Sequence, residues 1–186
     1  MPTIIALAGS VRRASANAAL LRAAIEVAPA TVSIDTASIA GIPLYNGDEE
    51  AATGIPEPVR ALKERVAGAD GLLLVTPEYN NSIPGTFKNA IDWLSRPASD
   101  IPRVFGGRAV ALMGATPGRG GTTLAQAAWL PVVRVLGMRP WFGRTLYVAG
   151  AGSVFDKDGK LVDEQVRKQL TAFMAGFAEF VIHSRA

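Results

Sequence analysis

Short apolar runs of strand length alternate along this chain with longer segments whose apolar residues recur every three to four positions. The runs predict strands at 3–8, 31–36, 71–76, 108–115 and 145–148. Most of these runs lack polar alternation, which is typical of parallel strands covered on both faces. The segments between them predict helices at 16–28, 59–66, 84–95, 122–136 and 166–181, with a loop rich in Gly and Pro at 41–58.

This alternation predicts an α/β fold, because a parallel strand must be reached by a crossover, and the crossovers here are helices. Right-handed crossovers then give a doubly wound sheet with helices on both faces. Five strands favour the flavodoxin-like order 2-1-3-4-5. The chain has 186 residues, 49% of them hydrophobic, and no repeat or linker divides it, so we expect one domain over 1–186.

The composition removes several classes of protein. The chain has no Cys, which excludes disulfides, thiolate metal sites and thiol nucleophiles, and it has one His. That residue, His183, lies near the end of the predicted last helix, where a cation suits the helix dipole. We therefore expect no metal site. The segment 156–159 begins like a calcium loop, but Lys160 and Arg167 stand where oxygen ligands are needed, so it is interpreted as a turn.

The charge pattern favours small-molecule partners. The net charge is +3, but the basic residues are scattered rather than gathered in a stripe with aromatic residues, so nucleic acid is not an expected partner. No apolar run approaches the roughly 20 residues of a membrane span. The first residues lead directly into the first strand without a basic segment or cleavage site, so we expect a cytoplasmic protein.

The loop after the first strand combines groups that suit a phosphate. In doubly wound sheets, ligands bind at the carboxyl ends of the strands, where the strand order reverses. Here this position holds a glycine, hydroxyl and amide side chains, a guanidinium and a helix N-terminus, which together favour an anion. The candidate residues are Gly9, Ser10, Arg12, Ser15, Ala16 and Asn17. The alternative is an ordinary helix start that Ser15 caps.

Two further loops meet the same edge of the predicted sheet. The loop after 76 contains Pro77, Glu78, Tyr79 and Asn80. Its Tyr offers a flat apolar face with a polar tip. The alternative is a turn bounded by Pro whose Tyr plugs the end of the sheet. The loop after 115 is rich in Gly, which allows a flat ligand to approach the backbone closely, or simply makes a flexible connection. Its candidates are Gly114, Thr116 and Gly118.

The phosphate loop lacks the motifs of two large nucleotide-binding classes. It does not have the three spaced glycines of the dinucleotide fingerprint, and no Gly-Lys-Ser/Thr of a P-loop occurs in the chain. A phosphate site without either motif favours a mononucleotide or a flavin phosphate.

Three motifs together resemble the NADPH-dependent FMN reductase family, and in particular its bacterial quinone and chromate reductases. The resemblance covers nearly the whole chain, and the segment 77–80 with the helix after it is its most specific part. One departure is Phe87, where relatives commonly carry Leu. The motifs are Gly9-Ser10-x-Arg12-x-x-Ser15-x-Asn17, Pro77-Glu78-Tyr79-Asn80 and Gly85-x-x-Lys88-Asn89-x-x-Asp92-Trp93, with further similarity at 43–46 and 155–159.

The resemblance implies an FMN-dependent NAD(P)H oxidoreductase. In the family the first loop binds the FMN phosphate, the second borders the isoalloxazine ring and the third closes its other side. FMN carries the chemistry, so no catalytic side chain is expected. The acceptors implied are quinones, free flavin, nitro or azo compounds, or metal oxyanions such as chromate. NADPH and NADH are both open as the donor. Two alternatives remain: a flavodoxin-type electron carrier, and a non-catalytic anion-binding module of the same fold.

Two predicted helices carry more apolar surface than one sheet can cover. The helix 84–95 has Trp93 off its main stripe, and the helix 122–136 repeats the pattern with Trp129. We therefore expect a homodimer through these helices, or a tetramer made of two such dimers, as the family resemblance also implies. Each FMN would be bordered by the partner's 45–50 loop. The alternative is that both Trp side chains pack within their own chain.

Overall fold

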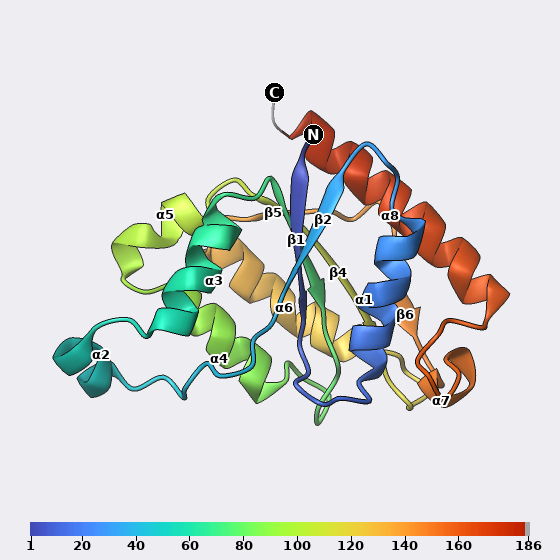
Figure 1. The fold of residues 1–186 in the computed structure, drawn as a ribbon, viewed down its shortest axis with the longest axis horizontal. Coiled ribbons are helices and arrows are strands. Elements are labelled where there is room, and N and C mark those ends of the chain that lie inside the picture. Colours follow the sequence, from blue (N-terminus) through green and yellow to red (C-terminus); the bar gives the residue numbers. More distant parts are fainter. Residues whose placement is uncertain (185–186) are drawn as a thin grey trace.

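The computed structural model describes residues 1–184, which form a parallel sheet with helices on both faces (Figure 1). The strand order is β2-β1-β3-β4-β5, and β6 also pairs with β4. This confirms the predicted 2-1-3-4-5 order and the α/β fold. The strands are β1 (Thr3–Ala8), β2 (Ser33–Ala37), β3 (Gly71–Val75), β4 (Ala109–Ala115), β5 (Arg139–Pro140) and β6 (Tyr147–Val148).

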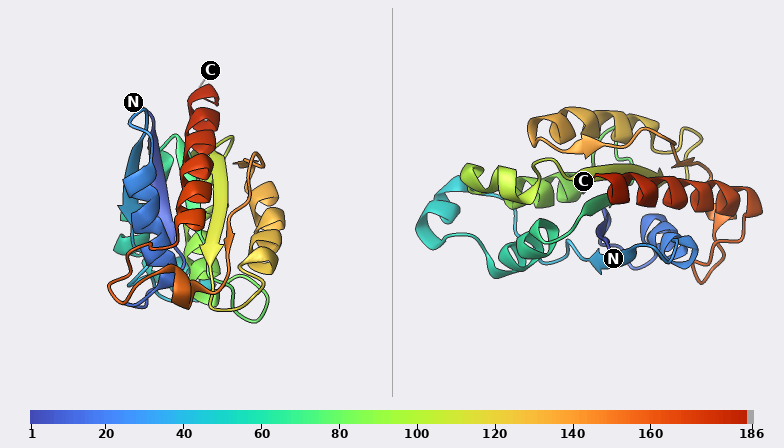
Figure 2. Two further views of the ribbon diagram at one scale, coloured as in Figure 1. Left: turned by 90° about the vertical axis from the view of Figure 1, so that its right-hand side faces the viewer. Right: turned by 90° about the horizontal axis from the view of Figure 1, so that it is seen from above.

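The helices form two layers around the sheet (Figures 1 and 2). Helices α1 and α8 cover one face, and α3, α4 and α6 cover the other. Helix α6 is assigned as one element although Pro131 lies inside it. The helical segments are α1 (Ala16–Val27), α2 (Gly47–Thr53), α3 (Glu57–Ala67), α4 (Gly85–Leu94), η1 (Ala98–Asp100), α5 (Ile101–Val104), α6 (Thr123–Val135), α7 (Ala151–Val154) and α8 (Glu164–His183).

Each central strand supplies both halves of the core, because successive side chains point to opposite faces. In β1, Ile4 joins the cluster under α1 and α8, whereas Ile5 joins the cluster under α3, α4 and α6. Both side chains are fully buried. Burying one such side chain stabilises the fold by about 1.5–3 kcal/mol. The two-sided burial explains why these strands are continuous apolar runs.

At the fifth position of the sheet, the structure differs from the prediction. A strand at 145–148 was expected there, but two short strands share the position. Arg139 in β5 pairs with the start of β4, and Tyr147 in β6 pairs with its end. The chain between them leaves the ladder, although the carbonyl of Leu146 still accepts from the N–H of Gly114 at 3.2 Å. The missed strand contains Pro140, which gives no strand signal because proline cannot donate to a ladder.

The segment predicted as a loop at 41–58 contains a helix. Helix α2 buries none of its residues and projects from the body at one end of the molecule (Figure 1). Its N-cap is Asn46, whose side chain accepts from Asp48 N–H at 3.0 Å. The preceding segment is fixed to α4, because the side chains of Asn89 and Trp93 both donate to the carbonyl of Pro43, at 2.9 and 2.8 Å. Without an apolar stripe, this helix had no periodic signal to reveal it.

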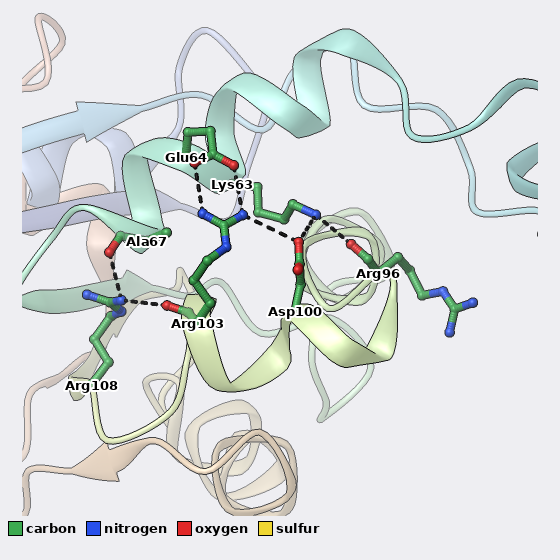
Figure 3. A network of polar contacts seen from close by, with 7 residues as sticks. All are labelled: Lys63, Glu64, Ala67, Arg96, Asp100, Arg103 and Arg108. Atoms are coloured by element: carbon green, nitrogen blue, oxygen red, sulfur yellow. Dashed lines mark hydrogen bonds and ion pairs between the residues drawn. The ribbon is translucent and has the colours of Figure 1, made fainter.

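A polar network outside the three predicted loops holds α3 against η1 and α5 (Figure 3). Lys63 is only 4% exposed, and its ammonium donates to the Asp100 carboxylate and the Arg96 carbonyl, both at 2.7 Å. Arg103 donates to both carboxylate oxygens of Glu64 at 2.8 Å. The hydrogen bond from Lys63 lowers the pKa of Asp100. A buried ammonium must be paired in this way, so the network is a structural one.

Candidate active site

A cleft of about 650 Å³ opens at the carboxyl ends of the strands. These strand ends point toward the lower edge of Figure 1. Its walls come from all three loops chosen from the sequence, together with α7 and the segment after it. Nine of the predicted residues line it: Ser10, Arg12, Ser15, Ala16, Asn17, Pro77, Glu78, Tyr79 and Thr116. Gly9, Asn80, Gly114 and Gly118 are not among the lining residues. The fold-position argument therefore brings the predicted loops together.

The first loop leads into the N-terminus of α1. Ser15 is the N-cap, and its hydroxyl accepts from the N–H of Ala18 at 3.2 Å. The capping role considered as the alternative is therefore present. The N–H groups of Ala16 and Asn17 have no partner within the helix, because the first-turn donors of any helix are free. Arg12 is exposed beside them and lines the cleft. This end of the cleft offers an anion both N–H donors and a guanidinium.

Asn17 joins the first loop to the third. Its side-chain amide donates to the carbonyl of Ala115 at 2.8 Å and accepts from the N–H of the same residue at 2.9 Å. Asn17 is buried. The amide therefore fixes the start of α1 to the end of β4, and its oxygen is already occupied by the backbone.

The second loop ends in a tight turn. Tyr79 and Ser82 exchange two backbone hydrogen bonds, at 3.1 and 3.0 Å. Asn80 and Asn81 between them have φ values of 50° and 59°, as a type I′ turn requires of its central residues. Asn80 thus shapes the turn and does not line the cleft. Tyr79 as a residue stays 45% exposed at the wall of the cleft, so it does not plug the end of the sheet.

Glu78 connects the second loop to helix α6. One carboxylate oxygen, Oε2, accepts from the N–H groups of Leu124 and Ala125, each at 2.9 Å. These are first-turn donors, so Glu78 caps a helix that starts 45 positions later in the chain. Within residues 1–184, Glu78 forms no ion pair with Arg or Lys.

Two predicted glycines are required by packing rather than by a ligand. A Cβ on Gly9 would collide with the ring of Phe87, and one on Gly114 would collide with the carbonyl oxygen of Thr76. A Cβ on Gly118 would make only ordinary contact with the side chain of Thr116, to whose hydroxyl the N–H of Gly118 donates at 3.4 Å. Thr116 carries the third loop into the cleft wall, and Gly118 lies just beyond the wall.

The charges in the cleft favour an anionic ligand. Four cations line it, and within residues 1–184 none of them forms an ion pair: Arg12, Arg13, Arg22 and Lys157. Three carboxylates line the cleft as well: Asp158, and those of Glu78 and Asp156, which accept backbone N–H groups. Unpaired cations on a concave wall raise the local concentration of anions.

One wall of the cleft was missed in the sequence. Helix α7 and the segment 155–159 line the side beyond the first loop. The sequence correctly predicts that 156–159 is a turn, since Asp156 accepts from the N–H groups of Asp158 and Lys160, both at 2.9 Å. Its position at the cleft depends on where the chain returns after β6, which no local pattern indicates. The matching segment 155–159 in the family resemblance was the one available signal.

These residues fit FMN by their chemistry. A cationic, N–H-rich loop meets the needs of a terminal phosphate, and the exposed ring of Tyr79 with the neighbouring backbone meets those of a flat heterocycle. The fold is flavodoxin-like, and the cleft lies at the strand switch point, where such folds bind their ligands.

Comparison with known proteins identifies the family. Residues 2–153 match the NADPH-dependent FMN reductase family, and the chain belongs to it. It is therefore an oxidoreductase that uses FMN and NAD(P)H, rather than an electron carrier or a non-catalytic module. In residues 1–184, no helix is both long enough and apolar enough to cross a membrane.

Three relatives illustrate the similarity. A 2-hydroxy-1,4-benzoquinone reductase of a Burkholderia species is 40% identical over 178 residues, 96% of this chain and 95% of that protein. An NAD(P)H-dependent FMN reductase of Pseudomonas aeruginosa is 40% identical over 165 residues, 89% of this chain and 87% of its own. The structure of FerB, a flavoenzyme NAD(P)H:(acceptor) oxidoreductase from Paracoccus denitrificans, is 32% identical with a TM-score of 0.88, covering 99% of both chains.

Proposed function

We propose that residues 1–186 act as one FMN-binding domain that passes hydride equivalents from a nicotinamide nucleotide to small oxidised acceptors, with quinones first among them. The observation that carries this proposal is the cleft itself, with an unpaired guanidinium and free helix N–H groups at one end and an exposed Tyr ring on another wall. Bound FMN supplies the hydride chemistry. The chain's own residues hold it and expose one face.

Some of the residues at the cleft are expected to contact FMN directly, and others to hold the loops in position. We expect Ser10, Arg12 and Ala16 to hold the phosphate, Pro77 and Tyr79 to border the ring, and Thr116 with the backbone near Gly118 to close the other side. Asn17, Glu78 and Ser15 support these loops, because their side chains already bond to backbone groups. No side chain is needed as a general base.

Quinones are favoured as acceptors because a relative 40% identical over nearly the whole chain is named as a benzoquinone reductase. Free flavin, nitro and azo compounds, and metal oxyanions such as chromate are further candidates, since an open flavin face discriminates weakly. The test is steady-state turnover with each acceptor, using NADPH and then NADH. A kcat/KM for benzoquinones above those of the other classes supports the proposal, and turnover with chromate alone would contradict it.

Tyr79→Ala tests the expected ring contact. Because stacking area is lost, the variant should bind FMN or the nicotinamide more weakly. Tyr147→Ala is a matched control, since Tyr147 is similarly exposed at 40% but is not among the residues that line the cleft. Equal affinities in both variants and the wild type would remove Tyr79 from the site.

We also propose a homodimer, which can double to a tetramer, although the argument from Trp93 and Trp129 was wrong. Both indoles are buried within their own chain, at 1% and 0% exposure. Helix α6 nevertheless keeps an exposed apolar side that includes Leu124, Leu130 and Val135. An apolar helix face of this kind favours association. The partner's 45–50 loop beside each FMN and the cytoplasmic location stay predictions, which a structure of the FMN complex and cell fractionation will test.

A further inference from the structure

Glu78 connects the second loop to the start of α6. It lines the cleft, and its Oε2 accepts both first-turn N–H groups at 2.9 Å. A cap on a neighbouring helix needs no charge, because Ser15 caps α1 with a neutral hydroxyl in the same cleft. The negative charge of the Glu78 carboxylate is therefore not required for these hydrogen bonds.

The negative charge of Glu78 has an electrostatic effect on the cleft. The N-terminus of a helix carries about half a positive elementary charge, and α6 has no acidic residue of its own in its first turn. The Glu78 carboxylate more than offsets this charge and leaves the ring side of the cleft negative. By contrast, the first loop and α1 bring three unpaired arginines and no carboxylate to the cleft, whereas the 156–159 turn brings one lysine and two carboxylates. The cleft is thus positive near the phosphate loop and negative at the second loop.

We propose that Glu78 lowers the reduction potential of the flavin and so keeps it a strong enough reductant for its acceptors; this rests on the proposed binding of FMN in the cleft. A hydride brings two electrons and one proton, so the isoalloxazine ring gains one negative charge when it accepts one. A fixed carboxylate beside the ring opposes that gain. Glu78 acts as a positioning residue, since its carboxylate bonds to α6 and does not touch the reacting atoms.

Glu78→Gln separates charge from shape. The amide keeps an oxygen that can accept from α6, but it removes the negative charge and leaves the helix end uncompensated. Reduced FMN should then bind better relative to oxidised FMN, by about tenfold, as expected for one charge acting through the protein. For a two-electron couple, tenfold corresponds to a rise of about 30 mV in the midpoint potential.

Asp163→Asn is the matched control. Asp163 caps α8 in the same manner, with its carboxylate accepting from Val166 N–H at 2.9 Å, and it does not line the cleft. The variant makes the same change from carboxylate to amide at another helix start. Its flavin potential should equal that of the wild type.

The experiment uses the FMN-loaded proteins and measures FMN binding first, then the midpoint potential, and the melting temperature as a check on folding. A higher potential in Glu78→Gln, with no change in Asp163→Asn, supports the proposal. An unchanged potential in a Glu78→Gln protein that binds FMN would overturn it while leaving the proposed function intact. Failure of the wild type to bind FMN would instead defeat the proposed function.

Glu78→Ala provides a second variant, which removes both the charge and the acceptor. Its potential should rise in the same direction as that of Glu78→Gln. If neither variant retains FMN while Asp163→Asn does, Glu78 is a structural cap and the electrostatic role is refuted.

Discussion

The side-chain amide of Asn17 and the backbone of Ala115 exchange two hydrogen bonds, of 2.8 and 2.9 Å, across 98 residues of sequence. This pairing extends the ladder of the sheet by one side chain. It fixes the N-terminus of α1 relative to the end of β4, so two walls of the cleft hold their spacing before any ligand arrives. A site whose loops are already in position loses less entropy on binding.

Asn17→Ala should therefore damage both stability and binding. It leaves the buried N–H and carbonyl of Ala115 without their partners, which costs about 1–3 kcal/mol of unfolding free energy. Denaturant unfolding of the protein without FMN isolates this cost. Ala18→Ser is a suitable control, because it changes a half-buried neighbour without touching the pair. Wild-type stability in Asn17→Ala would show that the pairing contributes nothing.

Arg12→Ala should weaken FMN binding by roughly tenfold or more, because a charge-assisted contact to phosphate is worth about 1.5–3 kcal/mol. Fluorescence titration of the protein with FMN measures the loss. Arg144→Ala removes an exposed arginine that does not line the cleft and should bind FMN normally. If the two variants bind alike, Arg12 is not part of the phosphate site.

The segment before α2 should loosen at both extremes of pH. The hydrogen bond from Arg96, at 2.9 Å, lowers the pKa of Glu50 from 4.5, and the hydrogen bond to Glu50 raises the pKa of Tyr45 from 10.0. The stabilisation from Glu50 is thus complete above its ordinary pKa and is lost as the pH falls through the lowered value. That from Tyr45 is complete below 10.0 and is lost as the pH rises through the raised value.

Ultraviolet titration of tyrosine absorbance tests this account. The difference between the wild type and Tyr45→Phe isolates one phenol, which should ionise above its ordinary range. In Glu50→Ala the acceptor of this hydrogen bond, the main cause of the shift, is gone, so the pKa of Tyr45 should fall. An unchanged Tyr45 titration in that variant would contradict the assigned cause.

Association through α6 should depend on its exposed apolar side. Val135 is 76% exposed, so Val135→Glu adds a charge to the proposed interface without disturbing the core. The wild type should sediment at twice the 19.5 kDa chain mass or more, and the variant should shift toward the monomer. Val162→Glu, at a residue outside this helix that is 49% exposed, should not. A wild-type monomer at micromolar concentration would refute the dimer.

Much of the site followed from the sequence because its location depends on strand order alone. The apolar runs at 3–8 and 71–76 indicate adjacent parallel strands, and the loops after them must meet at one edge. Residue types such as Arg12 then suggest the ligand. The same reasoning could not separate contact from support, because the partners of Asn17 and Glu78 lie 98 and 46 positions away in the sequence.

The error at Trp93 arose from contacts with a segment that is distant in the sequence. Trp93 lies off the main apolar stripe of α4, yet it is buried. The segment before α2 folds over it, and the carbonyl of Pro43 accepts a hydrogen bond from its indole N–H at 2.8 Å. Tyr45 adds an edge-to-face contact to the same indole, with ring centroids 4.9 Å apart. Periodicity in the sequence cannot indicate that a helix is covered by a segment 50 residues earlier in the chain. Trp93 was therefore a wrong reason to expect a partner chain, because the molecule covers this side chain itself.

The most direct test of the central claim is to mix the FMN-loaded protein with NADPH under anaerobic conditions, with no partner protein present, and to follow the visible flavin absorbance. The account predicts rapid bleaching, and recovery of the yellow colour when a benzoquinone is added. Slow or absent bleaching with both NADPH and NADH, in a protein that binds FMN, would contradict the assignment as a reductase.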